Sequence, residues 1–254
     1  NGWYTTLETT REYADEAQRM VGLGFDAIKF DIDPRPSRRD SYNRNISNED
    51  IAHFINVITA VRDALDPNTD LLVDAHWRYA PPDILKVAKA FESLNLLWLE
   101  DPIPPENIDA MAKVTRSTTT PICTGENFYT RHGFRDLIQK QAADIISPDL
   151  AKAGGLLEGR RIADLADMYY IPFSPHNICG PIGTVAASHV CAAIPNFQIL
   201  EFHHLDNDLW SNLTVGDDLI TDGHLSVATE PGLGVTLDEA VAREAAVENL
   251  GFLN

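Results

Sequence analysis

Three carboxylates stand at an even spacing in the chain, each at or just after the end of a short apolar run. These are Asp74, Glu100 and Glu126, and 26 residues separate each one from the next. Like charges that meet at one edge of a sheet repel each other unless a cation lies between them. Three oxygen ligands without cysteine suit a hard ion, Mg²⁺ before Ca²⁺ or Mn²⁺. The spacing therefore predicts a Mg²⁺ site, and the alternative is three independent helix caps.

Two histidines follow similar runs. His176 comes directly after an apolar run, and Asp149 ends the run before it. A carboxylate that orients an imidazole and stabilises its charged form makes the histidine a better base. His76 lies two residues after Asp74 and would share its face along an extended backbone. We expect His76 to act as an acid, to hydrogen-bond a substrate or to support the metal site.

The elements that position these side chains alternate along the chain. Short apolar runs predict strands, and the stretches between them predict helices. The predicted strands cover residues 27–30, 71–73, 96–99, 121–123, 144–146, 171–173 and 198–200. The predicted helices cover residues 9–21, 48–65, 82–93, 107–115, 131–140, 154–168 and 182–193.

This alternation is typical of a (β/α) barrel or a doubly wound sheet, with an eighth strand expected just before Asn1. In a barrel, catalytic residues gather where strands end, which is where the candidates stand. The sequence contains neither GxGxxG nor GxxxxGK[ST], which disfavours a nucleotide-binding fold.

No linker divides the chain, so we predict a barrel over residues 1–204 with a truncated first strand. Residues 205–254 contain turn signals at Gly216, Gly223 and 231–234, and we expect them to pack on the barrel or on another domain. The Pro-rich loop 33–37 is expected at the surface. The chain opens Asn1-Gly2-Trp3 without Met or a signal-peptide pattern, so we interpret it as a fragment.

Composition narrows the function classes. There are 38 acidic and 20 Lys or Arg residues, and the resulting net charge of −18 disfavours nucleic acid and anionic membranes as partners. The charge also suggests a halophilic protein, because salt screens self-repulsion. No apolar run approaches the roughly 20 residues of a membrane helix. Three cysteines without a CxxC pair predict buried thiols in a reducing cytoplasm, with neither disulfides nor zinc.

Taken in order, these stretches resemble the mandelate racemase subgroup of the enolase superfamily. The resemblance runs from about Gly24 to Gly234, almost the whole chain. The matching segments are Val73-Asp74-Ala75-His76, Trp98-Leu99-Glu100-Asp101-Pro102-Ile103, Thr124-Gly125-Glu126-Asn127, Asp149-Leu150-Ala151-Lys152-Ala153-Gly154-Gly155, Pro175-His176-Asn177 and Pro231-Gly232-Leu233-Gly234.

The resemblance implies a TIM-like modified (β/α)₇β barrel, preceded in the family by an N-terminal α+β capping domain that is absent from this chain. It implies that the three carboxylates bind Mg²⁺ and that Asp149 and His176 form a catalytic pair. Glu201 matches an acidic residue that faces the substrate carboxylate or the developing enolate. The subgroup also often forms homo-oligomers.

Two positions refine the expected activity. Subgroup members usually have Lys-x-Lys after the second strand, whereas this chain has Lys29-Phe30-Asp31, which argues against a two-base racemase. His76 is similar to the acid of sugar-acid dehydratases such as galactonate dehydratase. The resemblance thus implies dehydration of an aldonic acid to a 2-keto-3-deoxy acid. Lys29, Asp31 and Asn127 are then expected to bind substrate, with Asp31 tuning Lys29.

Three other activities stay open. A racemase or epimerase would use Asp31 or Lys29 as its second base. A Schiff-base aldolase would use Lys29, and a non-catalytic sugar-acid binding protein would need no base. Arg78 and Tyr79 would contribute to the site or lie at the surface.

Overall fold

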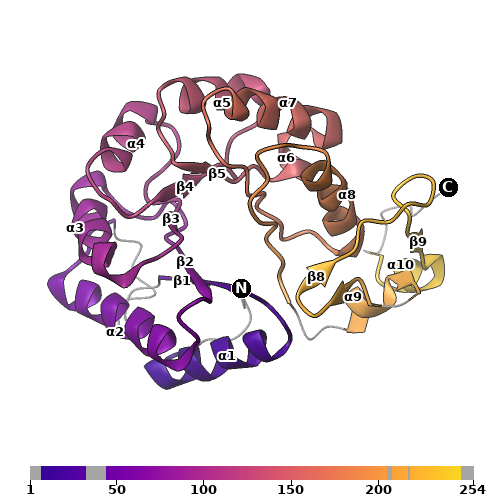
Figure 1. Ribbon diagram of the computed structural model, residues 1–254, viewed down its shortest axis with the longest axis horizontal. Helices are drawn as coiled ribbons and strands as arrows, with labels where there is room; N and C mark the ends of the chain where they lie inside the picture. The colour runs from indigo at the N-terminus through magenta and orange to yellow at the C-terminus, as the bar shows by residue number, and fades with distance from the viewer. Residues whose placement is uncertain (1–6, 33–43, 205–207, 217, 247–254) are drawn as a thin grey trace.

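A five-stranded parallel sheet forms the centre of the computed structural model, which describes residues 7–32, 44–204, 208–216 and 218–246. Its strands follow chain order: β1 (Ala27–Asp31), β2 (Asp70–Asp74), β3 (Trp98–Glu100), β4 (Ile122–Thr124) and β5 (Ile145–Ile146). Phe173 continues the arc, because it bridges Ile146 on one side and Phe197 on the other. Figure 1 shows the strands on the inside of a ring of helices. The predicted α/β, TIM-like architecture is confirmed.

The helices occupy the stretches that the sequence predicts. They are α1 (Thr10–Gly22), α2 (Asn48–Ala64), α3 (Pro81–Phe91), α4 (Ile108–Thr115), α5 (Thr130–Gln139), α7 (Gly155–Asp167) and α8 (Pro181–Ala192), with a 3₁₀ turn η2 (Glu92–Leu94) after α3. Thr9 and Ser47 cap α1 and α2 with reciprocal hydrogen bonds to Glu12 and Asp50. These caps fix where each helix begins.

Three predicted elements differ from the structure. The helix predicted over 154–168 begins earlier, as a short α6 (Leu150–Ala153), and Gly154 then breaks it with φ 118° before α7 begins. Glycine tolerates this left-handed conformation without steric cost. The strands predicted over 171–173 and 198–200 are reduced to single bridges at Phe173 and Phe197.

Strand alternation separates two apolar layers. Outward-facing residues such as Ile28, Val73 and Leu99 join the large core beneath the helices. Inward-facing residues form a smaller cluster inside the arc: Leu72, Trp98, Cys123 and Ile145. Cys123 and Cys191 are buried as predicted, but Cys179 is half-buried because it lies in the loop before α8. The inner layer leaves the ends of the strands for polar side chains.

The C-terminal segment forms small elements beside the barrel (Figure 1). They are α9 (Asp208–Asn212), β6 (Thr214–Val215) paired with β9 (Thr236–Leu237), β7 (Ile220–Thr221) paired with β8 (His224–Leu225), and α10 (Glu239–Glu244). His189 of α8 contacts the carbonyl of Leu233 at 3.0 Å, which joins this segment to the barrel. The loop predicted over 33–37, and residues 205–207, 217 and 247–254 of the predicted tail, lie outside the described residues.

Within the described ranges, every helix is too short or too polar to cross a bilayer.

Candidate active site

The parallel register places carboxylates side by side at the strand ends. Asp74 pairs with Asp31 on one side and with Glu100 on the other. Neighbouring strands lie about 4.8 Å apart, so equivalent side chains meet. Lys29 precedes Asp31 by two residues and therefore points to the same interior face. One row across three strands thus concentrates negative charge, with a lysine just below it.

The sequence-predicted ligands come together. Asp74, Glu100 and Glu126 each offer a carboxylate oxygen, and these oxygens lie within 4.8 Å of one another. The residues are only 2%, 1% and 4% exposed. Glu100 Oε1 is buried without a hydrogen-bond partner among the described residues, a cost that a bound cation would remove. This trio, an all-oxygen set, fits a hard divalent ion.

The pKa values of Glu100 and Glu126 reflect their burial and their charged neighbours. Burial raises the pKa of Glu100 to about 7, with Asp74 and Glu201 adding to the effect while Lys29 opposes it. Burial acts to raise the pKa of Glu126 too, but its contact with His176 outweighs this and lowers it. A nearby positive charge would therefore favour the ionised form of Glu100.

Lys29 supplies part of that charge. Its ammonium lies 2.9 Å from Glu100, 2.7 Å from Glu201 and 3.6 Å from Asp74, with the side chain 10% exposed. Burial disfavours the charged form, yet these carboxylates raise the pKa of Lys29 well above its usual value. Asp31, which was expected to tune Lys29, has one carboxylate oxygen 3.7 Å from His76 Nδ1. A charged lysine also lacks the lone pair that a Schiff base or a proton acceptor needs.

His176 and Asp149 form the pair that the sequence suggested. His176 Nδ1 lies 3.0 Å from one Asp149 oxygen, and the other oxygen accepts the backbone N–H of Lys152. His176 Nε2 faces Glu126 Oε2 at 2.7 Å. Burial lowers the pKa of His176, but the bonds to Asp149 and Glu126 outweigh it and raise the pKa to about 10. The ring is held between a helix-capping aspartate and a member of the trio.

Glu201 is surrounded by donors. Besides Lys29, the backbone N–H of Asn177 donates to Glu201 Oε2 at 3.0 Å, and His203 Nε2 lies 3.4 Å from Glu201 Oε1. Burial opposes ionisation, but Lys29 and the histidines hold the pKa of Glu201 well below its usual range. Asn177 and His203 were missed by sequence reasoning. Their positions could have indicated them, because Asn177 directly follows His176 and His203 lies two residues after Glu201.

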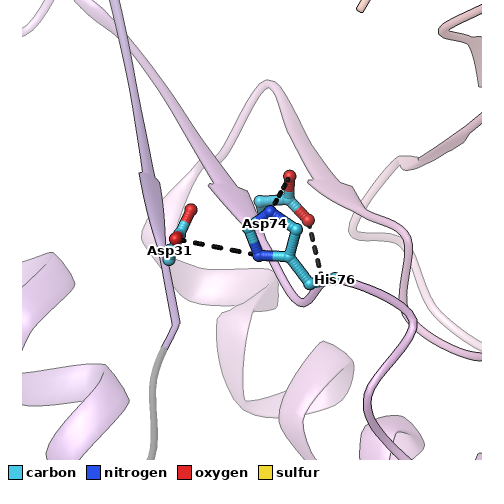
Figure 2. A group of neighbouring side chains, drawn as sticks. All are labelled: Asp31, Asp74 and His76. Carbon is cyan, nitrogen blue, oxygen red and sulfur yellow. Dashed lines mark hydrogen bonds and ion pairs between the residues drawn. The ribbon is translucent and has the colours of Figure 1, made fainter. Parts of the chain in front are cut away.

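His76 reaches the site by a route that the sequence did not suggest. β2 ends at Asp74, and His76 and Trp77 adopt left-handed φ values of 47° and 44° instead of the expected extended backbone. His76 still turns toward Asp74: its N–H donates to Asp74 Oδ1 at 2.7 Å, and its Nε2 lies 3.5 Å from Asp74 Oδ2 (Figure 2). The Trp77 N–H donates to the carbonyl of Asp101 at 2.6 Å, which fixes this turn.

The remaining polar residues near the site differ in how deeply they are buried. Asn127 is half-buried directly after Glu126. Tyr79 is 1% exposed and its hydroxyl donates to the carbonyl of Ile32, so it belongs to the core rather than to the site or the surface. Arg78 is half-buried. Asp101, which sequence reasoning did not select, is buried, accepts a hydrogen bond from Thr124, and burial raises its pKa well above the usual range.

A cavity of about 520 Å³ adjoins these side chains. It lies between β1 and the segment around Gln198–Phe202, and Lys29, Glu100, His176 and Glu201 line its polar side. Asp74, Glu126 and His76 do not line it. Most of the other lining residues are apolar.

Comparison with known proteins agrees with this geometry. The sequence model of the family described as "Enolase C-terminal domain-like" matches residues 12–241. A crystal structure of a mandelate racemase/muconate lactonizing enzyme-like protein from Rubrobacter xylanophilus superimposes with a TM-score of 0.92 at 46% identity. That superposition covers 99% of this chain and 64% of the other.

Curated relatives have dehydratase names. D-xylonate dehydratase of Haloferax volcanii is 48% identical over 227 residues, which are 89% of this chain and 55% of the relative. D-gluconate/D-galactonate dehydratase of Picrophilus torridus is 28% identical over 254 residues, which are all of this chain and 63% of the relative. The chain thus spans a little more than half the length of these relatives.

Proposed function

Because the chain belongs to the enolase C-terminal domain-like family, we propose that it forms the barrel of a Mg²⁺-dependent sugar-acid dehydratase. The reaction removes water from an aldonic acid and gives a 2-keto-3-deoxy acid. One observation supports this most strongly. Two histidines, each beside an aspartate, approach different members of one carboxylate trio: His176 contacts Glu126, and His76 contacts Asp74.

The first step is proton removal. Asp149 accepts the Nδ1–H of His176, which leaves the Nε2 lone pair to act as the base. Nε2 faces Glu126 at the trio, and we assign it to accept the proton on carbon 2. The electrons of that C–H bond pass to the carboxylate and form an enediolate. Asp74, Glu100 and Glu126 would hold a Mg²⁺, whose positive charge would bind the substrate carboxylate and stabilise the added negative charge.

The second step is loss of the hydroxyl on carbon 3. His76 protonates that oxygen as its bond to carbon breaks, and water leaves. The resulting enol becomes the 2-keto acid. Lys29 lies next to the trio, and we assign it to binding the substrate carboxylate. Glu201, ionised among donors, accepts a hydrogen bond from a substrate hydroxyl. We assign Asn127 to substrate binding too, since it directly follows Glu126.

The wider assignments are proposals as well. We propose that residues 1–204 form the barrel unit and that residues 205–254 pack against it. We propose that the protein acts in the cytoplasm as a homo-oligomer. The names of the relatives put D-xylonate, D-gluconate, D-galactonate and arabinonate among the substrates to test first.

The test is a screen of the full-length protein with Mg²⁺ against a panel of aldonic acids. Products are detected as semicarbazones of 2-keto-3-deoxy acids. We expect at least one acid to give product, and we expect EDTA or His176→Ala to abolish it. Deuterium exchange on carbon 2 without dehydration would contradict dehydration and indicate an epimerase. Absence of both product and exchange would contradict the proposed chemistry altogether.

A further inference from the structure

Asp31 lies beside the turn that presents His76. The register pairs Asp31 at the end of β1 with Asp74 at the end of β2. His76 follows two residues later, and its Nδ1 lies 3.7 Å from Asp31 Oδ2. The side chains of Asp31 and His76 are 23% and 13% exposed, so the contact is only partly screened by water. Figure 2 shows the imidazole between the two carboxylates.

The two ring nitrogens of His76 face different carboxylates. Nδ1 is directed to Asp31 at 3.7 Å, and Nε2 to Asp74 at 3.5 Å. One ligand atom from each of Asp31, Asp74 and His76 lies within 4.8 Å of the others, which is close enough for a shared metal ion. The two aspartates face opposite nitrogens of the ring, and an oriented imidazole uses both of these contacts.

The backbone beneath the ring is already fixed. Ala75 N–H donates to the carbonyl of Glu100 at 3.0 Å, and Trp77 N–H donates to that of Asp101 at 2.6 Å. The His76 N–H is bound to Asp74. The remaining freedom is rotation of the imidazole about its side-chain bonds. An acceptor at Nδ1 selects the rotamer, and in the doubly protonated ring that acts as an acid both Nδ1 and Nε2 bear a hydrogen.

We propose that Asp31 is a positioning residue for His76, which accepts the Nδ1–H and aims the Nε2–H at the leaving hydroxyl of the substrate. This inference rests on the proposed dehydration. The hydroxyl oxygen takes both electrons of its bond to carbon 3 and the proton from Nε2, so it leaves as water. The double bond forms from the electron pair released on carbon 2. His76 is left neutral, and no oxidant or reductant is needed.

The experiment separates protonation of the leaving group from proton removal. Asp31→Ala and Asp31→Asn are compared with His76→Asn and with the matched control Asp70→Asn, which alters an exposed aspartate at the other end of β2. Each Mg²⁺-loaded full-length variant is assayed with the aldonic acid and with its 3-deoxy-3-fluoro analogue. Fluoride leaves without a proton, yet it gives the same 2-keto-3-deoxy product. Exchange of the carbon 2 proton in D₂O is measured in parallel.

General acid catalysis contributes typically 10²–10⁴-fold, so His76→Asn should lower kcat for water loss by about that factor. Asp31→Ala should lower kcat by about 10–100-fold with little change in KM, because the acid is present but misaimed. Asp31→Asn keeps a hydrogen-bond acceptor, so its kcat for water loss should fall less than that of Asp31→Ala. All three should eliminate fluoride and exchange the carbon 2 proton at nearly the wild-type rate, and Asp70→Asn should match the wild type throughout.

Three results would overturn the proposal. Equal loss of water and fluoride elimination in both Asp31 variants would show a general structural effect. Wild-type dehydration in Asp31→Ala would show that His76 needs no partner. Loss of one bound Mn²⁺ per chain in Asp31→Ala, counted by equilibrium dialysis, would make Asp31 a metal ligand. A wild type that yields no product from either substrate would instead contradict the proposed dehydration.

Discussion

Two aspartate–histidine pairs lie against the same carboxylate trio, and they differ in how tightly they are held. Asp149 and His176 are 3.0 Å apart with side chains 2% and 6% exposed. Asp31 and His76 are 3.7 Å apart with side chains 23% and 13% exposed. The tight pair suits a base whose charge must be stabilised, whereas the looser pair leaves a proton donor open to a departing hydroxyl. One architecture thus supports two roles through different degrees of burial.

Removing each histidine should separate these roles most sharply. In His176→Asn, carbon 2 exchange and dehydration should both fall by about 10²–10⁴-fold or more, because the base is gone. In His76→Asn, exchange should persist while dehydration falls. Proton NMR in D₂O measures exchange on the same samples as product formation. His132→Asn, an exposed position on α5, is the control. Loss of exchange in both histidine variants would contradict the assignment of different roles to His176 and His76.

Metal removal should disable both pairs together. Glu100→Gln removes one ligand and the carboxylate oxygen that lacks a partner, so Mg²⁺-dependent turnover should be lost. Isothermal titration with Mn²⁺ should show binding weakened by about 100-fold or more, which corresponds to roughly 3 kcal/mol. Glu106→Gln, at an exposed loop position, should bind like the wild type. Unchanged binding in Glu100→Gln would show that the trio is not the metal site.

Lys29 should matter most when no ion is bound. Lys29→Met leaves buried carboxylates without their partner, a change that typically costs about 3–5 kcal/mol. We expect the unfolding free energy of Lys29→Met to fall by this amount in EDTA. The fall should be smaller with Mg²⁺, because the ion also neutralises the buried carboxylates. Urea denaturation provides the values. Lys86→Met, which alters an exposed pair with Asp83, should cost less than about 1 kcal/mol. Equal losses with and without Mg²⁺ would contradict this view of Lys29.

The tight pair should also give the metal-free protein a pH signature. The pKa of His176 is raised to about 10, against 6.5 for the free side chain. A raised histidine pKa means that its stabilisation is fully present below pH 6.5 and is lost as pH rises toward 10. Urea denaturation in EDTA should show stability falling across this window, and His176→Asn should flatten the decline. An unchanged slope in that variant would assign the decline to other groups.

Salt should have the smallest effect and act on the whole surface rather than on either pair. With a net charge of −18, screening by molar KCl should raise the melting temperature by roughly 4 °C, or about 1 kcal/mol. Differential scanning fluorimetry in KCl and in an isosmotic neutral solute measures this. A rise of equal size in both solutions would point to solute exclusion instead of screening.

Sequence patterns predicted the elements well wherever periodicity and strand ends decide the outcome. The 26-residue spacing of Asp74, Glu100 and Glu126 follows from one strand–helix repeat, and the structure brings the three together. The partners of Lys29 and Asp31 were not predictable, because register decides which side chains on neighbouring strands meet.

Local backbone geometry was also hidden in the sequence. The left-handed turn at His76 depends on hydrogen bonds to Glu100 and Asp101, which are distant in the chain. The short α6 that precedes Gly154 was not predicted, since the predicted helix begins only at residue 154. Where hydrogen bonds between distant parts of the chain determine the backbone conformation, the sequence can identify a candidate residue. It cannot predict the direction in which the side chain points.

The most direct test of the central claim is transfer of solvent deuterium to carbon 2 of an aldonic acid by the Mg²⁺-loaded full-length protein. We predict exchange or dehydration that requires the ion and His176, and that continues as exchange when His76 is replaced by Asn. Neither exchange nor dehydration with any aldonic acid in the panel would contradict the account, even if the trio binds Mg²⁺.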